Sequence, residues 1–234
     1  MTGWAGFFPK LWPEMFRILL RKEFLVELKS KEISASMLTF GIAVILIFAF
    51  SFNVPPDIMS TFAPGLFWVM TLFISTLGLH RMYAYEKEFD AFGFLISSPV
   101  DRGLIFLAKW VSGTLYLILT DILILPPFIL FLQLQVRVSI GLAVLILILG
   151  NLGLMVLGSL VSGLAMRAKM SEVLLPVLLF PLASPVMIAA TKATAGLLNG
   201  EPFQFWQVWV LILGTFIISF GLVGFLVFDH ITEE

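Results

Sequence analysis

The sequence predicts an all-helical integral membrane protein with six spanning helices and an N-terminal helix on the membrane surface. The first observation is composition: 60% of the 234 residues are hydrophobic, 12% are charged and 24 are Phe. The mean hydropathy of +1.06 exceeds what a soluble domain needs to fill one core. The second observation is that the few charges are spaced so that long uncharged runs separate them.

These uncharged runs give the positions of the spans. A helix needs about 20 apolar residues to cross a hydrocarbon layer about 30 Å thick. Five uncharged runs of 19 to 29 residues have this length, and a sixth stretch is interrupted only by Asp121. The predicted transmembrane domain, 35–228, therefore contains spans at about 35–53, 62–80, 109–132, 139–165, 173–191 and 206–228.

The cations predict the orientation, because loops rich in Lys and Arg are retained in the cytoplasm. Of the 14 Lys and Arg residues, all except Arg137 and Lys192 fall in one set of loops. Both termini are therefore predicted to be cytoplasmic, including the tail 229–234, and so is the loop 81–108 between the second and third spans.

Residues 1–34 are predicted to form a cytoplasmic amphipathic helix. Pro13 and Glu14 suit its start, and Lys29 and Lys31 suit its end, by their interaction with the helix dipole. Apolar residues recur every four positions, at Phe16, Leu20, Phe24 and Leu28. Such a helix lies along the inner membrane surface, either as a plain anchor or as a contact for a partner.

The segment "EKEFDAFGFLISSPVDR", residues 86–102, concentrates charge between two apolar spans. Phe89, Phe92 and Ile96 share one side of a short helix, and Pro99 ends that helix because the residue before proline avoids helical geometry. These apolar side chains need a surface to bury against, each burial contributing about 1.5–3 kcal/mol. Lipid headgroups and a groove on a cytoplasmic protein are the two alternatives.

Asp121 lies in the middle of the third span, where a carboxylate costs about 2.5–3.5 kcal/mol. Such a residue is either functional or paired, and Thr114, Thr120 or a neighbouring helix are the expected partners. Pro126 follows and bends the helix by freeing a backbone carbonyl.

The fifth span carries Pro176, Pro181 and Pro185, so we expect it to be broken or flexed. Together with Pro126 these residues are candidate hinges, and the alternative is a static bundle that tolerates them.

The fourth span places Asn151, Gly158 and Ser162 on one helical face. Small residues there permit close helix approach, first for packing within the chain and second for a subunit interface.

Several classes of function are disfavoured by the sequence. There is no Cys and there are two His, which leaves no expected metal site. No G-x-x-x-x-G-K-[ST] motif cradles phosphates, no catalytic motif is evident and no basic run suggests nucleic acid. We therefore expect that the chain is not an enzyme, has no catalytic residues, and retains its N-terminus uncleaved.

Four segments carry a family resemblance in order along nearly the whole chain: "GLFWVMTLFISTLGLHRMYAYEKEFDAFGFLISSPVDRGLIFLAKW", "LYLILTDILILPPFILF", "SEVLLPVLLFPLASPV" and "FDHITEE". They resemble the haem exporter protein B family, the CcmB permease of cytochrome c maturation, within the wider class of ABC-2 type permeases. Ala63-Pro64-Gly65, Pro99-Val100-Asp101-Arg102 and the acidic third span make the resemblance specific. The sequence departs from that family at Asp90, usually Gly, and at Gly93, usually Glu.

The resemblance implies that the chain lies in the bacterial cytoplasmic (inner) membrane and that the loop is a coupling helix seated on a separate, cytoplasmic ABC ATPase subunit. By position, it assigns the ATPase contact to Glu86, Lys87, Glu88, Phe89, Phe92, Leu95 and Pro99. ATP then binds the partner ATPase, and haem is bound through partner subunits rather than by this chain alone.

The resemblance implies haem delivery for c-type cytochromes, by moving haem itself or by releasing a haem chaperone. A second membrane subunit is expected, either a haem-handling protein or a second copy of the chain. The alternative function is an ABC-2 type exporter of a drug, lipid or polysaccharide.

Overall fold

The structure, a computed structural model, describes residues 8–51, 54–88, 100–134, 138–165 and 171–231. Within these residues the chain is helical, and no strand is present. The helices are α1 (Phe8–Ser30), α2 (Glu32–Ser51), α3 (Pro56–Glu88), α5 (Arg102–Phe131), α6 (Ile140–Ala165), α7 (Ser171–Leu198) and α8 (Phe203–Ile231).

Six helices, all except α1, are long and apolar enough to cross a membrane. Over the described residues, this confirms the prediction of an all-helical fold with six candidate spans. α3 and α5 extend beyond the uncharged runs, because α3 continues to Glu88 and α5 already begins at Arg102. A helix does not have to end where the apolar run ends, since its backbone hydrogen bonds continue through a charged turn.

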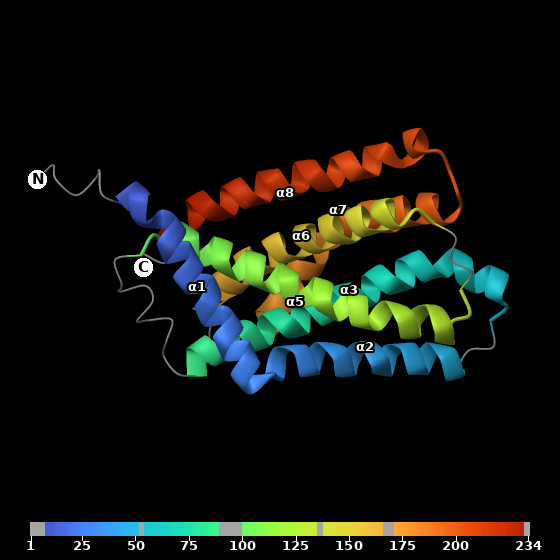
Figure 1. The fold of residues 1–234 in the computed structure, drawn as a ribbon, viewed down its shortest axis with the longest axis horizontal. Coiled ribbons are helices and arrows are strands. Elements are labelled where there is room, and N and C mark those ends of the chain that lie inside the picture. Colours follow the sequence, from blue (N-terminus) through green and yellow to red (C-terminus); the bar gives the residue numbers. More distant parts are fainter. Residues whose placement is uncertain (1–7, 52–53, 89–99, 135–137, 166–170, 232–234) are drawn as a thin grey trace, which may run out of the picture.

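The six long helices run side by side in alternating directions, and α1 crosses them at one end (Figure 1). The last turns of α3 and α8 and the first turn of α5 lie at that same end. Asp101 caps α5 there, because its Oδ1 accepts a hydrogen bond of 2.9 Å from the backbone N–H of Gly103.

α5 and α6 lie at the centre of the bundle, and α6 packs against α3, α5, α7 and α8. Glycines on α6 permit this packing. The indole of Trp68 covers Gly150, where a Cβ would overlap the ring. That indole is fixed by a 2.9 Å hydrogen bond from its Nε1 to Oγ1 of Thr194 on α7. Close approach of helices without side chains between them is typical of membrane bundles.

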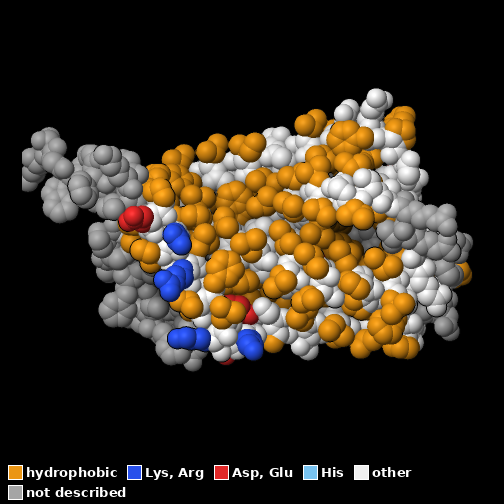
Figure 2. Space-filling view, viewed as in Figure 1, with side chains coloured by type: hydrophobic (Ala, Val, Ile, Leu, Met, Phe, Trp, Pro, Cys, Tyr) orange, Lys and Arg blue, Asp and Glu red, His pale blue; other side chains and the backbone are white. Residues whose placement is uncertain are grey.

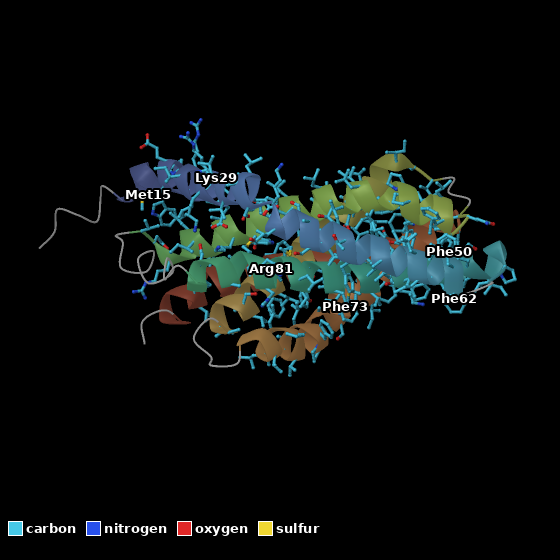
Figure 3. All side chains as sticks on the ribbon, turned by 90° about the horizontal axis from the view of Figure 1, so that it is seen from below. Met15, Lys29, Phe50, Phe62, Phe73 and Arg81 are labelled. Atoms are coloured by element: carbon cyan, nitrogen blue, oxygen red, sulfur yellow. The ribbon has the colours of Figure 1, made fainter. Side chains whose placement is uncertain are left out.

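The outer surface of the spans is apolar. Figure 2 shows hydrophobic side chains over most of one face and Lys and Arg side chains gathered over α1 at one end. In Figure 3, Met15 and Lys29 mark α1 at this end, whereas Phe50 and Phe62 lie at the opposite end. Charged and apolar surfaces are thus separated along the length of the bundle.

α7 runs as one helix through Pro176, Pro181 and Pro185, so of the two expectations for the fifth span, broken or flexed, the first is wrong for the structure. The role of these prolines as hinges stays a prediction. Pro185 cannot donate to the carbonyl of Pro181 four residues earlier. Oγ of Ser184 donates to that carbonyl instead, at 2.8 Å. A side chain therefore replaces the missing backbone donor, and the helix continues.

Candidate functional site

Four charged side chains meet where α1 crosses the ends of α3 and α5. Lys109 on α5 contacts Glu86 on α3, with Nζ to Oε1 at 2.8 Å, and Glu23 on α1, with Nζ to Oε1 at 3.1 Å. Lys22 contacts the same two carboxylates, Glu23 at 3.0 Å and Glu86. We call these four residues the ion ring, because each cation touches both carboxylates.

The ion ring is largely removed from solvent. Lys109 is 1% exposed, Glu86 4% and Glu23 7%, and only the side chain of Lys22 reaches solvent substantially. Burial alone would raise the pKa of the Glu86 carboxyl, but the ammonium groups of Lys109 and Lys22 outweigh burial and lower that pKa. Glu86 is therefore held as a carboxylate between two cations.

Aromatic rings line the same region. Nζ of Lys109 lies 5.0 Å from the ring centroid of Tyr83, a cation–π distance. The hydroxyl of Tyr83 donates to the carbonyl of Ser159 on α6 at 3.1 Å. Phe24 on α1 packs edge-on against Tyr116 on α5, with ring centroids 5.6 Å apart. The ion ring is therefore continuous with the packed interior of the bundle.

A second carboxylate of α1, Glu27, connects α1 to α2. Its Oε1 accepts from the backbone N–H of Ser34 at 2.8 Å, and its Oε2 accepts from that of Ile33 at 3.2 Å. These N–H groups belong to the first turn of α2, where a helix has no backbone carbonyl of its own to accept their hydrogen bonds. Only Lys31, with a φ of 56°, separates α1 from α2. Glu27 thus fixes the corner between the two helices.

The buried face of α1 differs from the predicted stripe of Phe16, Leu20, Phe24 and Leu28. Leu28 is 69% exposed, whereas Leu19, Glu23 and Glu27 are buried. These residues are also spaced by four, so they form one face of the helix. The four-residue spacing of this face was present in the sequence. Two acidic residues on it can be recognised as buried only when their partners are known.

Asp121 is completely buried among α3, α5 and α6. Its Oδ2 accepts a 2.7 Å hydrogen bond from Nδ2 of Asn151 on α6. Oγ1 of Thr71 on α3 lies 3.5 Å from its Oδ1. The expected partners Thr114 and Thr120 instead donate to carbonyls of α5 itself, so the neighbouring helices hold Asp121.

The three small or polar residues singled out on the fourth span are all buried on α6. Asn151 bonds Asp121, and Gly158 lies beneath Leu79 of α3. Ser162 is 3% exposed. Within the chain, these residues therefore face other helices of the same bundle.

The predicted ATPase contact falls mostly outside the described residues. Phe89, Phe92, Leu95 and Pro99 lie there, and so do the side chains of Lys87 and Glu88. The carboxyl of Glu86 points into the ion ring. We therefore place Glu86 with the ring, on the flank of the loop, rather than on its outer surface.

Pro126 lies on α5 within a continuous helix, as the prolines of α7 do. Its hinge role stays a prediction. Among the described residues, no group of three His, Asp or Glu side chains is placed to hold a metal ion.

Comparison with known proteins places these features in a family. Residues 14–231 match the family described as "CcmB protein". The chain is 30% identical to Heme exporter protein B of Pseudomonas aeruginosa over 215 residues, which cover 89% of this chain and 96% of that protein. It is 29% identical to Heme exporter protein B of Haemophilus influenzae over 178 residues, 76% of this chain and 80% of that protein.

The matched region includes the ion ring, Asp121 and all six candidate spans. A match of this extent confirms the resemblance that the sequence segments indicated. The chain, a multi-pass membrane protein, belongs to the CcmB family.

Proposed function

We propose that this chain is the transmembrane permease subunit of an ATP-driven complex that exports or delivers haem for c-type cytochrome biogenesis. The observation that carries the proposal is the family match over residues 14–231, together with the match to 96% of the length of a protein named Heme exporter protein B. The chain itself is not an enzyme in this proposal, since ATP hydrolysis belongs to a partner subunit. The membrane is the bacterial cytoplasmic membrane.

In this proposal the loop between α3 and α5 faces the cytoplasm and receives the ATPase. Two observations support the orientation. The loop's flanking helix ends lie at the same end of the bundle as α1. The exposed face of α1 carries Arg17, Arg21 and Lys29, which suit the headgroups of the inner leaflet. Both termini are cytoplasmic in this orientation, and the architecture is that of an ABC-2 type permease.

The ATPase contact is assigned to Lys87, Glu88, Phe89, Phe92, Leu95 and Pro99. The apolar members of this set need a surface to bury against, and a groove on the ATPase supplies one. The complex includes another membrane subunit, a haem-handling protein or a second copy of this chain. Haem itself, or a haem chaperone released from a neighbour, is what the cycle moves, and haem is bound through the partner subunits.

Deletion of the gene followed by haem staining of periplasmic c-type cytochromes tests this function. We expect the deletion strain to lack holocytochromes and the intact chain to restore them. Phe92→Asp should insert in the membrane at normal levels yet fail to restore staining, whereas Phe92→Leu, which keeps the apolar contact, should restore it. Normal staining in the deletion strain would exclude the proposed function, and normal staining with Phe92→Asp would exclude only the coupling assignment.

A further inference from the structure

The ion ring is closed: two cations and two carboxylates make four contacts, and each charge has two partners of opposite sign. The net charge of the ring is zero. A buried charge that loses its last partner is strongly destabilising. In this ring any one pair can separate while every charge keeps one partner. The arrangement therefore tolerates relative movement that a single buried ion pair would not.

Two further features of the ion ring suit such movement. The ring of Tyr83 lies 5.0 Å from Nζ of Lys109 and offers it a second favourable surface. Oε2 of Glu86 has no hydrogen-bond partner among the described residues, so this oxygen is an open acceptor for either lysine. The ion ring thus contains more hydrogen-bond acceptors than its present contacts use.

The position of the ion ring relates it to the loop. Glu86 lies two positions before the end of α3, and Lys109 lies seven positions after the start of α5. These are the two helices that border the loop. The other two charges belong to α1, and Glu27, one turn after Glu23, holds the first turn of α2. A displacement of the loop flanks is therefore passed to α1 and then to α2 through polar contacts.

We infer that Lys22, Glu23, Glu86 and Lys109 form a movable joint that positions α1 and α2 in response to the loop. The inference rests on the proposed function, in which the loop is moved by an ATPase. A joint of this kind requires charges that exchange partners. A purely structural cluster does not, because well-packed apolar residues replace buried ion pairs with little loss of stability.

Two fourfold variants separate a joint from a structural cluster. The apolar variant, K22L/E23L/E86L/K109M, keeps a packed cluster without charges. The transposed variant, K22E/E23K/E86K/K109E, keeps four opposite-charge contacts and the same net charge, so the cation balance that sets orientation is unchanged. Membrane level and holocytochrome staining are measured for both. We expect the apolar variant to accumulate normally but to lower staining roughly tenfold, as the loss of a coupling free energy would, and the transposed variant to retain most staining.

A distance measurement tests the movement directly. The sequence contains no Cys, so Ile18→Cys and Leu226→Cys give one labelled pair at sites that are each 66% exposed. The inter-label distance is measured in membranes that contain the whole complex, with and without ATP. We expect ATP to shift the distance in the otherwise unchanged chain and in the transposed variant, but not in the apolar variant.

The outcomes distinguish the inference from the function on which it rests. Normal staining with the apolar variant, or an unchanged label distance in a complex that makes cytochromes, would overturn the joint and leave the haem function intact. If the apolar variant fails to accumulate, the label distance in the otherwise unchanged chain still tests the joint, because a distance that ATP does not alter overturns it. Normal cytochromes in the deletion strain would instead overturn the proposed function.

Discussion

Nδ2 of Asn151 donates a 2.7 Å hydrogen bond to Oδ2 of Asp121 and so joins α6 to α5 inside the bundle. Both side chains are fully buried, so Nδ2 of Asn151 has no access to solvent if this acceptor is lost. Asp121→Leu should therefore destabilise the chain by about 2 kcal/mol, the cost of a buried polar group left unpaired. Asp121→Asn should cost less, because its amide oxygen still accepts from Asn151.

The two substitutions are compared by unfolding in detergent, with Leu123→Asn as a control for a polar change at an exposed position of α5. Equal stability of Asp121→Leu and the unchanged chain would show that this bond contributes nothing. Haem staining of the same strains reports separately whether the charge of Asp121 matters for function.

Gly150 on α6 lies directly under the indole of Trp68. Gly150→Ala places a methyl group against this indole, which the hydrogen bond from Nε1 of Trp68 to Thr194 holds in place. Overpacking of this kind costs about 1–3 kcal/mol. Gly141→Ala is the matched control on the same helix, because its Cβ would meet nothing within 4 Å. We expect that control to be neutral or slightly stabilising through helix propensity. Thermal unfolding of the two variants checks the contrast.

Glu27→Ala removes the acceptor that holds Ile33 and Ser34 of α2. Loss of such a cap costs about 0.5–2 kcal/mol and should increase motion at the corner between α1 and α2. Hydrogen exchange of the first turn of α2 measures this directly. Glu14→Ala, which removes an exposed carboxylate from the same helix, should leave that exchange unchanged.

The ion ring predicts an acid-sensitive contact between α1 and the bundle. The pKa of Glu86 is lower in the folded chain than its ordinary value of 4.5. Its contribution to stability is therefore complete above that ordinary value and is lost as the pH falls through the lowered pKa. A spin label at Ile18 should become more mobile as the pH falls below that ordinary value. Glu86→Gln, which carries no charge at any pH, should already show weaker attachment at neutral pH and a smaller acid response. An acid response that this substitution leaves unaltered would show that Glu86 is not the group responsible.

The spans were the most predictable part of the fold. A run of about 20 uncharged residues has few uses other than crossing a membrane. The five uncharged runs and the stretch interrupted by Asp121 therefore located α2, α3 and α5 to α8 without any knowledge of packing. Asp121 was also evident from the sequence, because a carboxylate in such a run needs an explanation. Its partners were not evident, since they depend on how each helix is rotated about its axis.

The ion ring shows more clearly what the sequence conceals. Lys22 and Lys109 counted only among the cations that predict the orientation, and Glu23 was not singled out at all. Nothing local distinguishes them from solvated residues. Glu23 and Lys109 are buried because α1 crosses α5 at the height of Lys109, a contact between residues 86 positions apart. The motif Pro99-Val100-Asp101-Arg102 was recognised as specific, and the structure adds that Asp101 caps α5.

The single residue between α1 and α2 has a consequence for chain length. Because Lys31 alone separates the two helices, inserting one residue there would turn α2 by about 100° about its axis. Ile33, Met37 and Ile45 would leave the core and lipid-facing residues would replace them. We expect functional variants of this chain to accept many substitutions on the outside of α2 but no change in the number of residues at this corner.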